Sequence, residues 1–171
     1  MIFREAKRDD LDNIMKVISS GKKSLKALEI DQWQKGNPNR EQILRDIRNH
    51  ESFLIENQDE IIGTAALVRG IDRVYEEIYE GSWIECNNYC AIHRIAVLDH
   101  YKNAGVASKL LENLEKQAGY WKLTDVRIDT HPGNTVMQKW IVKHKFHYCG
   151  KVDQADGMRL AYQKLLVNDE E

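Results

Sequence analysis

The sequence predicts an α/β fold in which helices cover both faces of a mixed β-sheet. Two observations lead to this fold class. Helical and strand-like runs alternate along the chain and two strand-like runs end it, which requires mixed strand directions. The second half also contains two successive strand-then-helix units, whose parallel strands leave a crevice at their carboxyl ends. The length suits one well-buried core, so we expect a single domain over residues 1–171.

The amino-terminal part is expected to be a short strand followed by helices. Residues 2–3 are apolar, and Asp9 or Asp10 can cap a helix whose apolar residues recur at spacings of three and four. Gly21 is expected to break this helix, because glycine is unfavourable inside helices. Residues 22–30 are expected to form a second helical piece.

A third helix and a hairpin are predicted next. Asn39 precedes Gln42 by three residues, the spacing of a capping box, so a helix should begin there. The runs 52–56 and 60–68 are rich in strand-forming residues and are separated by turn formers, which predicts an antiparallel hairpin. Residues 69–83 are expected to form an ordered loop or a short helix.

The second half is predicted to contain four strands and two helices. The expected strands cover residues 89–98, 124–130, 146–152 and 158–165, and the expected helices start near Ala104 and cover residues 134–144.

Composition excludes several classes of protein. The formal net charge of −2 offers no positive field for nucleic acid. No apolar run could span a membrane and the amino terminus does not resemble a signal peptide, so a cytoplasmic location is expected. Cys86, Cys90 and Cys149 fit neither a disulfide set nor a zinc motif and are interpreted as reduced thiols. His144 and His147 have no third ligand nearby in sequence, so no metal site is expected.

The most informative segment is residues 97–108, where a strand end, a polar turn and a helix start follow one another. Free backbone N–H groups converge at such a helix start and can bind a pyrophosphate. Gly105 would let the backbone approach the phosphates, Ala107 would keep the helix close, and Lys102 adds a cation. Neither a Walker motif nor a Gly-x-Gly-x-x-Gly fingerprint is present, so this turn alone is a weak signal.

The wider context resembles the GNAT superfamily of N-acetyltransferases. The stretches HRIAVLDHYKNAGVASKLLENLEKQA and VRIDTHPGNTVMQKWIVKHKF carry the resemblance. The family signature of Gln or Arg, two residues, Gly, one residue, Gly or Ala corresponds to Lys102, Gly105 and Ala107. The asparagine that opens the next helix and the aromatic residue after it correspond to Asn134 and Phe146.

The resemblance is firm over residues 90–150 and implies a fold, a reaction and a cofactor. The implied fold is a mostly antiparallel sheet of about seven strands with a splayed parallel pair in the middle. The implied enzyme moves the acetyl group of acetyl-CoA to a primary amine of a small molecule or peptide. A non-catalytic acyl-CoA-binding module of the same fold is the alternative, and a homodimer is left open.

The resemblance also implies cofactor-binding residues. The pantetheine arm would pair with the backbone of a bulged strand, the pyrophosphate would bind the turn, and Asn134 would hold the cofactor amides or a water. Many relatives carry a proton-donating tyrosine where this chain has Ile141, so the general acid is unassigned. The implied cofactor residues are Ile95, Ala96, Val97, Lys102, Asn103, Ala104, Gly105, Val106, Ala107, Ser108, Asn134 and Ile141.

Candidate residues for the acceptor side are less specific. An alkylamine must lose a proton before it attacks, and relatives place acidic or histidine bases at the positions of His93 and Asp129. Structural roles remain open, including an ion pair of Asp129 with Arg94 or Arg127. An acidic, aromatic segment before the cofactor strand favours a cationic acceptor. The residues expected to bind it are Asp31, Trp33, Tyr75, Trp83 and His131.

Overall fold

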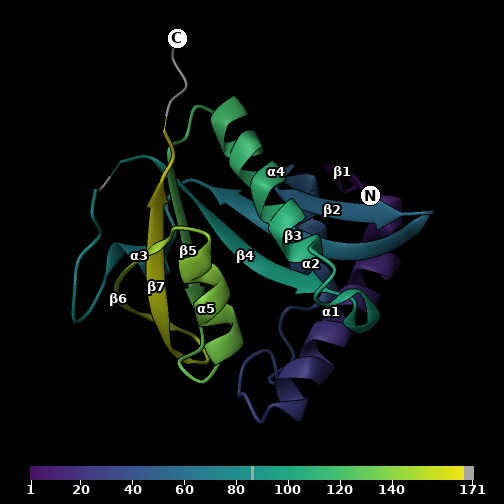
Figure 1. Ribbon diagram of the computed structural model, residues 1–171, viewed down its shortest axis with the longest axis horizontal. Coiled ribbons are helices and arrows are strands. Elements are labelled where there is room, and N and C mark those ends of the chain that lie inside the picture. The colour runs from purple at the N-terminus through teal and green to yellow at the C-terminus, as the bar shows by residue number, and fades with distance from the viewer. Residues whose placement is uncertain (86, 168–171) are drawn as a thin grey trace. The chain divides into compact units, whose positions relative to one another are not determined.

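The computed structural model describes residues 1–85 and 87–167, so Cys86 lies outside the described residues. A seven-stranded mixed sheet has the strand order β1-β2-β3-β4-β5-β7-β6 with one parallel pair, β4 and β5, which confirms the predicted fold class (Figure 1). Cys90 and Cys149 are free thiols, as expected. None of the helices in the described ranges is both long and apolar enough to cross a membrane.

The helices and strands after residue 39 lie close to their expected bounds. The strands are β1 (Ile2–Glu5), β2 (Ser52–Asn57), β3 (Glu60–Arg69), β4 (Tyr89–Val97), β5 (Asp125–Thr130), β6 (His147–Gln154) and β7 (Gly157–Leu165). The α-helices are α1 (Leu11–Ala27), α2 (Arg40–Arg48), α3 (Arg73–Glu76), α4 (Val106–Tyr120) and α5 (Thr135–Lys143), with 3₁₀ turns η1 (Arg8–Asp10) and η2 (Asp99–Tyr101).

The chain forms two compact units. Unit 1 combines Met1–Val68 with Ile92–Leu114, and unit 2 combines Arg69–Ala91 with the chain from Glu115 onward. The strand β4 contributes its first three residues to unit 2 and the remainder to unit 1. The single domain expected from the sequence stays a prediction.

Unit 1 has helices on both faces of its strands. The strands β1, β2 and β3 pair antiparallel in sequence order. Adjacent residues of one strand point to opposite faces, and here they enter different clusters. Leu54 and Ile61 pack with α1 and α2, whereas their neighbours Ile55 and Ile62 pack with the first turns of α4. The sheet therefore holds the start of α4 on the face opposite α1 and α2 (Figure 1).

The helix α1 differs from the prediction at both ends. It continues through Gly21 to Ala27, so the expected break and the separate second helix are wrong. A Cβ at Gly21 would lie 3.0 Å from Trp33, so the glycine serves close packing of the indole on the helix. Asp10 does not cap α1 with its side chain; its carboxylate instead binds the guanidinium of Arg4 and the N–H of Lys7.

The helix α2 begins as predicted but only half of the capping box forms. The side chain of Asn39 accepts a hydrogen bond from the N–H of Gln42 at 2.9 Å. The Gln42 amide does not return to the cap and instead donates to Asp46 at 3.1 Å. Asp46 is buried and also binds Arg94 of β4, which connects this helix to the strand expected to hold the cofactor.

Unit 2 is built on an antiparallel sheet of β5, β7 and β6. The segment before β4 packs along β6, where Tyr79 and Lys151 form a two-way backbone bridge. A Cβ at Gly81 would lie 1.9 Å from the carbonyl oxygen of Cys149, so only glycine allows this approach. An aromatic core forms between this segment and the strands, from Tyr75, Trp83, Tyr89, Ala91, Cys149, Val152 and Ala161.

Candidate functional site

The turn before α4 has the backbone geometry of an anion-binding site. Asn103 and Gly105 adopt left-handed conformations, with φ of 61° and 79°. The first α-helical hydrogen bond of α4 runs from the N–H of Lys109 to the carbonyl of Gly105, 3.0 Å away. The N–H groups of Val106, Ala107 and Ser108 come before Lys109 in the first turn. No carbonyl of α4 can therefore accept from them in the α-helical pattern.

The surroundings of this turn also suit an anion. A Cβ built on Gly105 would meet no atom within 4 Å, so the space beside its Cα is open to a ligand. The first turn of α4 has no acidic side chain that would occupy the N–H groups. The helix dipole adds about 0.3–1 kcal/mol of attraction for a negative charge there. The residues present therefore fit a bound pyrophosphate.

A glycine outside the motif sets the position of this helix start. A Cβ at Gly63 of β3 would lie 2.9 Å from Val106 and 3.1 Å from Leu110. Only a residue without a side chain lets α4 pack this close to the sheet. Sequence reasoning missed Gly63, although a lone glycine inside a strand often indicates close backbone approach.

The ammonium of Lys102 is bound by other side chains of the protein, which the sequence motif does not indicate. Its ammonium lies 2.5 Å from the hydroxyl of Ser24 and 3.1 Å from the carboxylate of Asp99. The N–H of Asp99 in turn donates to the hydroxyl of Ser20 at 3.0 Å. These contacts fasten the turn to α1, and Asp99 offsets part of the positive charge that Lys102 brings.

The end of β4 is irregular where the resemblance implies a bulge. Arg94 has a φ of 54°, so regular extension stops immediately before Ile95. The guanidinium of Arg94 holds this conformation by binding Asp46 at 2.7 and 2.9 Å. Ala96 then packs with α1 and α2, and Ile95 and Val97 pack toward α4. The backbone segment expected to pair with pantetheine is thus fixed from both faces.

The remaining implied cofactor residues lie in unit 2. Asn134 caps α5, because its side-chain oxygen accepts a hydrogen bond from the N–H of Met137 at 3.1 Å. Ile141 is fully buried and has no group that could donate a proton. His131 accepts a hydrogen bond from the N–H of Gly133 through Nδ1, 2.9 Å away.

Asp129 is held by neutral donors. The hydroxyl of Tyr75 donates to its carboxylate at 2.6 Å and the amide of Gln154 at 3.2 Å. The suggested ion pair with Arg127 is wrong, because that guanidinium binds Asp125. Tyr75 is almost completely buried, and burial together with the Asp129 charge raises the pKa of its phenol well above the ordinary value. Tyr75 therefore stays a hydrogen-bond donor.

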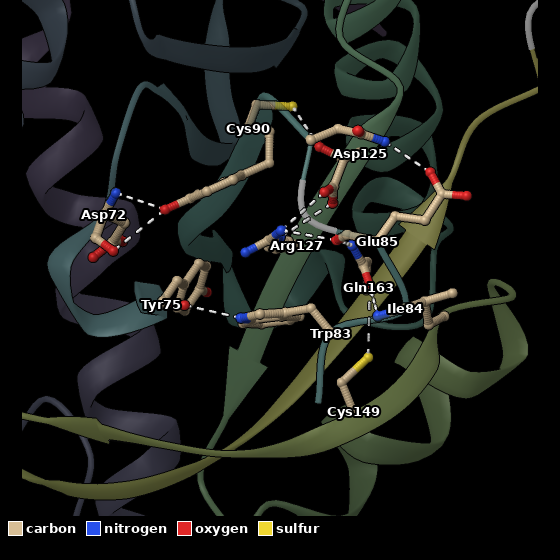
Figure 2. A network of polar contacts seen from close by, with 12 residues as sticks. Asp72, Tyr75, Trp83, Ile84, Glu85, Cys90, Asp125, Arg127, Cys149 and Gln163 are labelled. Carbon is tan, nitrogen blue, oxygen red and sulfur yellow. Dashed lines mark hydrogen bonds and ion pairs between the residues drawn. The ribbon is translucent and has the colours of Figure 1, made fainter. Parts of the chain in front are cut away.

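Next to this pair lies a polar network that the sequence reasoning did not single out (Figure 2). Arg127 and Asp125 form a buried ion pair at 2.9 Å on β5. The guanidinium lies 4.2 Å from the ring centre of Trp83 and 3.9 Å from that of Tyr89, two cation–π contacts. The signal was present as alternating polar residues, Asp125, Arg127 and Asp129, on one face of an otherwise apolar strand.

Unit 2 contains a cleft of about 500 Å³ beside this network. Tyr75 and Trp83, both expected to bind the acceptor, line it. Asp31 and Trp33 belong to unit 1, where Asp31 is exposed near Lys35. The half-buried His93 also belongs to unit 1. In the described ranges no group of three or more His, Cys, Asp or Glu side chains could hold a metal ion.

A helix start with the backbone geometry of an anion-binding site, following a strand of the one parallel pair, is typical of α/β proteins that bind nucleotide coenzymes. The chain belongs to the acetyltransferase (GNAT) family, whose sequence profile matches residues 22–146. This confirms the resemblance noted in the sequence and the class of enzyme. A search of curated protein sequences found no match.

Solved structures share the fold. A GNAT family acetyltransferase from Streptococcus agalactiae 2603 is 36% identical, with a TM-score of 0.91 over 98% of this chain and 96% of that one. The paia N-acetyltransferase from Thermoplasma acidophilum, in complex with coenzyme A, is 18% identical, with a TM-score of 0.71 over 96% and 98%. A ribosomal-protein-alanine N-acetyltransferase from Brucella melitensis is 16% identical, with a TM-score of 0.70 over 97% and 100%. At these identities the last two establish the fold alone.

Proposed function

We propose that this acetyltransferase uses acetyl-CoA and delivers the acetyl group to a primary amine of a small molecule or peptide. The observation that carries the proposal is the turn before α4, with open space at Gly105 and no acidic side chain in the first helical turn. A bound acetyl-CoA supplies a thioester-activated acetyl group. A cytoplasmic location and a homodimer stay predictions.

The protein's own residues would bind and orient the cofactor. In this proposal the N–H groups of Val106, Ala107 and Ser108 hold the pyrophosphate, and the backbone of Ile95–Val97 receives the pantetheine arm. Asn134 keeps its amide N–H groups for the cofactor or a water, because its oxygen is used as the α5 cap.

Deprotonation of the acceptor is assigned to His93 or Asp129. A primary alkylamine has a pKa near ~10.4, so it arrives protonated and must lose a proton before attack. Asp129 is an acceptor already oriented by Tyr75 and Gln154, and His93 has an imidazole that can take a proton from the amine or through one water.

The proposal is tested by turnover with a panel of amines, polyamines, amino acids and short peptides, measured as release of free CoA. His93→Ala or Asp129→Asn should lower turnover by ~10²–10⁴-fold. Their CoA affinity, measured by calorimetry, should be unchanged. The matched controls are His50→Ala and Asp59→Asn, which change the same residue types at positions not assigned to the cofactor or the acceptor and should keep full turnover.

Two outcomes count against the proposal. If the wild-type protein binds CoA but acetylates none of the amines, it is the non-catalytic module of the same fold. If both His93→Ala and Asp129→Asn keep full turnover, neither residue is the base and the proton leaves to solvent.

A further inference from the structure

The cleft in unit 2 has the size and lining of a small-molecule site. Its volume of about 500 Å³ lies within the range of ligand pockets, roughly 300–1,000 Å³. Aromatic side chains and charged or amide side chains line it in similar measure. Six of its lining residues form the candidate ligand site: Tyr75, Glu76, Trp83, Tyr89, Trp121 and Arg127.

Arg127 presents an unused hydrogen-bonding group to this cleft. Its side chain is only 3% exposed, and Nε and Nη2 bind Asp125 and the carbonyl of Glu85. Nη1 has no hydrogen-bond partner among the residues that the structure describes. Arg127 lines the cleft, so Nη1 is the guanidinium nitrogen left for a ligand there.

The position of that group is rigid. The ion pair with Asp125 fixes one edge of the guanidinium, and the rings of Trp83 and Tyr89 contact it at 4.2 and 3.9 Å. Figure 2 shows Arg127 bound to Asp125 and Glu85 above Trp83. A donor fixed in this way loses little entropy when a ligand oxygen binds, which favours affinity.

The carboxylate of Glu76 lies beside Tyr89, the tyrosine whose ring contacts Arg127. The hydroxyl of Tyr89 is 3.4 Å from the carboxylate of Glu76, while its ring contacts Arg127. The Tyr89 side chain therefore lies between Arg127, which can donate to a ligand oxygen, and Glu76, whose carboxylate can bind a cation. The charge of Arg127 is offset by Asp125. Arg69 also lines the cleft, with its guanidinium 4.1 Å from the ring centre of Trp121, and adds a positive charge, whereas Glu76 adds a negative one. The combination suits a single carboxylate accompanied by an ammonium group.

We propose that this cleft binds a small zwitterion of the amino-acid type. Its carboxylate accepts hydrogen bonds from Nη1 of Arg127, its ammonium faces Glu76, and its apolar part lies against Trp83 and Trp121. Such a zwitterion has one of two roles: it is either the acetyl acceptor or a separate ligand. In the first case the inference rests on the proposed function and names the acceptor class; in the second it is independent of acetyl transfer.

The test measures binding by calorimetry with no acetyl-CoA present. The probes are phenylalanine, phenethylamine and 3-phenylpropionate, which share one apolar body and carry both charges, the ammonium only, or the carboxylate only. Phenylalanine should bind at least about tenfold more tightly than either partner compound, because each charged end adds a charge-assisted hydrogen bond. Leucine and tryptophan extend the set to smaller and larger bodies.

Variants locate the two ends of the ligand. Glu76→Gln should remove the advantage of phenylalanine over 3-phenylpropionate, while Glu77→Gln, the same change at the next residue outside the cleft, should keep it. Arg127→Lys keeps a cation for Asp125 but lacks the second guanidinium nitrogen, so it should remove the advantage over phenethylamine. Thermal unfolding shows whether Arg127→Lys is folded, and Glu76→Gln tests the proposal if it is not.

The outcomes separate the site from the reaction. Mass analysis of phenylalanine after incubation with acetyl-CoA identifies an acceptor if it is acetylated and a separate ligand if it binds unchanged; both support the site. Equal affinity for the three compounds, no binding of any of the three amino acids, or unchanged discrimination in Glu76→Gln would overturn it. Because binding is measured without acetyl-CoA, a failure of the proposed transferase activity leaves this readout intact.

Discussion

The two proposed ligand sites, the turn before α4 and the cleft of unit 2, rely on opposite means of recognition. At the turn, backbone N–H groups and the open space at Gly105 would provide the site, and the ammonium of Lys102 is bound by the protein itself. In the cleft, side chains provide the site, and the central donor, Arg127, is held by a buried ion pair. A backbone site tolerates side-chain changes that keep its conformation, whereas a side-chain site does not.

Glycines show the same contrast. Gly105 is needed for a left-handed backbone and leaves space for a ligand. Gly81 is needed because protein fills the space, since its Cβ would lie 1.9 Å from a backbone oxygen. Substitution of Gly105 should therefore affect ligand binding, and substitution of Gly81 should affect folding.

The largest effect, on the free energy of unfolding, is expected when the buried ion pair of Arg127 and Asp125 is broken. Arg127→Met leaves the carboxylate of Asp125 buried with no cation beside it, so the free energy of unfolding should fall by about 3–5 kcal/mol. Urea unfolding measures this loss. CoA affinity of the folded fraction should change little, because the turn belongs to unit 1.

A double variant sharpens that prediction. Asp125→Asn combined with Arg127→Met removes both charges, so it should cost less than the two single changes together. Additive costs would show that the two side chains contribute separately, and the account of the cleft as one coupled structure would be wrong.

The backbone site is expected to lose affinity and keep its fold when a charge enters the open space. Gly105→Glu places a carboxylate beside the expected pyrophosphate, and Gly105→Gln places a neutral side chain of the same shape with the same left-handed strain. CoA should bind Gly105→Glu roughly tenfold or more weakly than Gly105→Gln, measured by calorimetry. Equal CoA affinity in the two folded variants would exclude this turn as the phosphate site.

The same difference explains what the sequence could predict. The turn could be found because a backbone site needs few residue types at short spacing, here Gly105 and Ala107 after a strand. The cleft could be predicted only in part: Tyr75 and Trp83 come from the acidic, aromatic segment before β4, but Arg127 joins them only through the packing of separate segments. Gly21 misled the helix prediction for a related reason: its indole neighbour, Trp33, lies beyond the helix in sequence, so local propensity alone pointed to a break.

Cys90 gives a smaller, pH-dependent test of burial around the ion pair. Burial and the charge of Asp125 raise the pKa of its thiol to about 12, so the folded protein keeps the proton while the unfolded chain loses it above pH ~9. Stability from this group is thus present below pH ~9 and lost as the pH rises. Relative to Cys90→Ala, the wild-type protein should lose about 1.4 kcal/mol of unfolding free energy per pH unit above that point. A constant difference between the two proteins from about pH 8 to pH 10 in urea unfolding would contradict the raised pKa.

The smallest effect is expected at Lys102, the residue that would matter most if the turn were a side-chain site. Its ammonium is shared by Ser24 and Asp99 and is partly exposed, so Lys102→Ala should change the free energy of unfolding by only about 0–1 kcal/mol. CoA affinity should fall a few-fold at low salt and by less at high salt, because exposed charges are screened. Asp99→Asn is the matched control: it frees the ammonium, so CoA should bind this variant slightly more tightly than the wild-type protein at low salt. A loss of CoA binding in Lys102→Ala as large as that in Gly105→Glu would show that the side chain, and not the backbone, holds the phosphates.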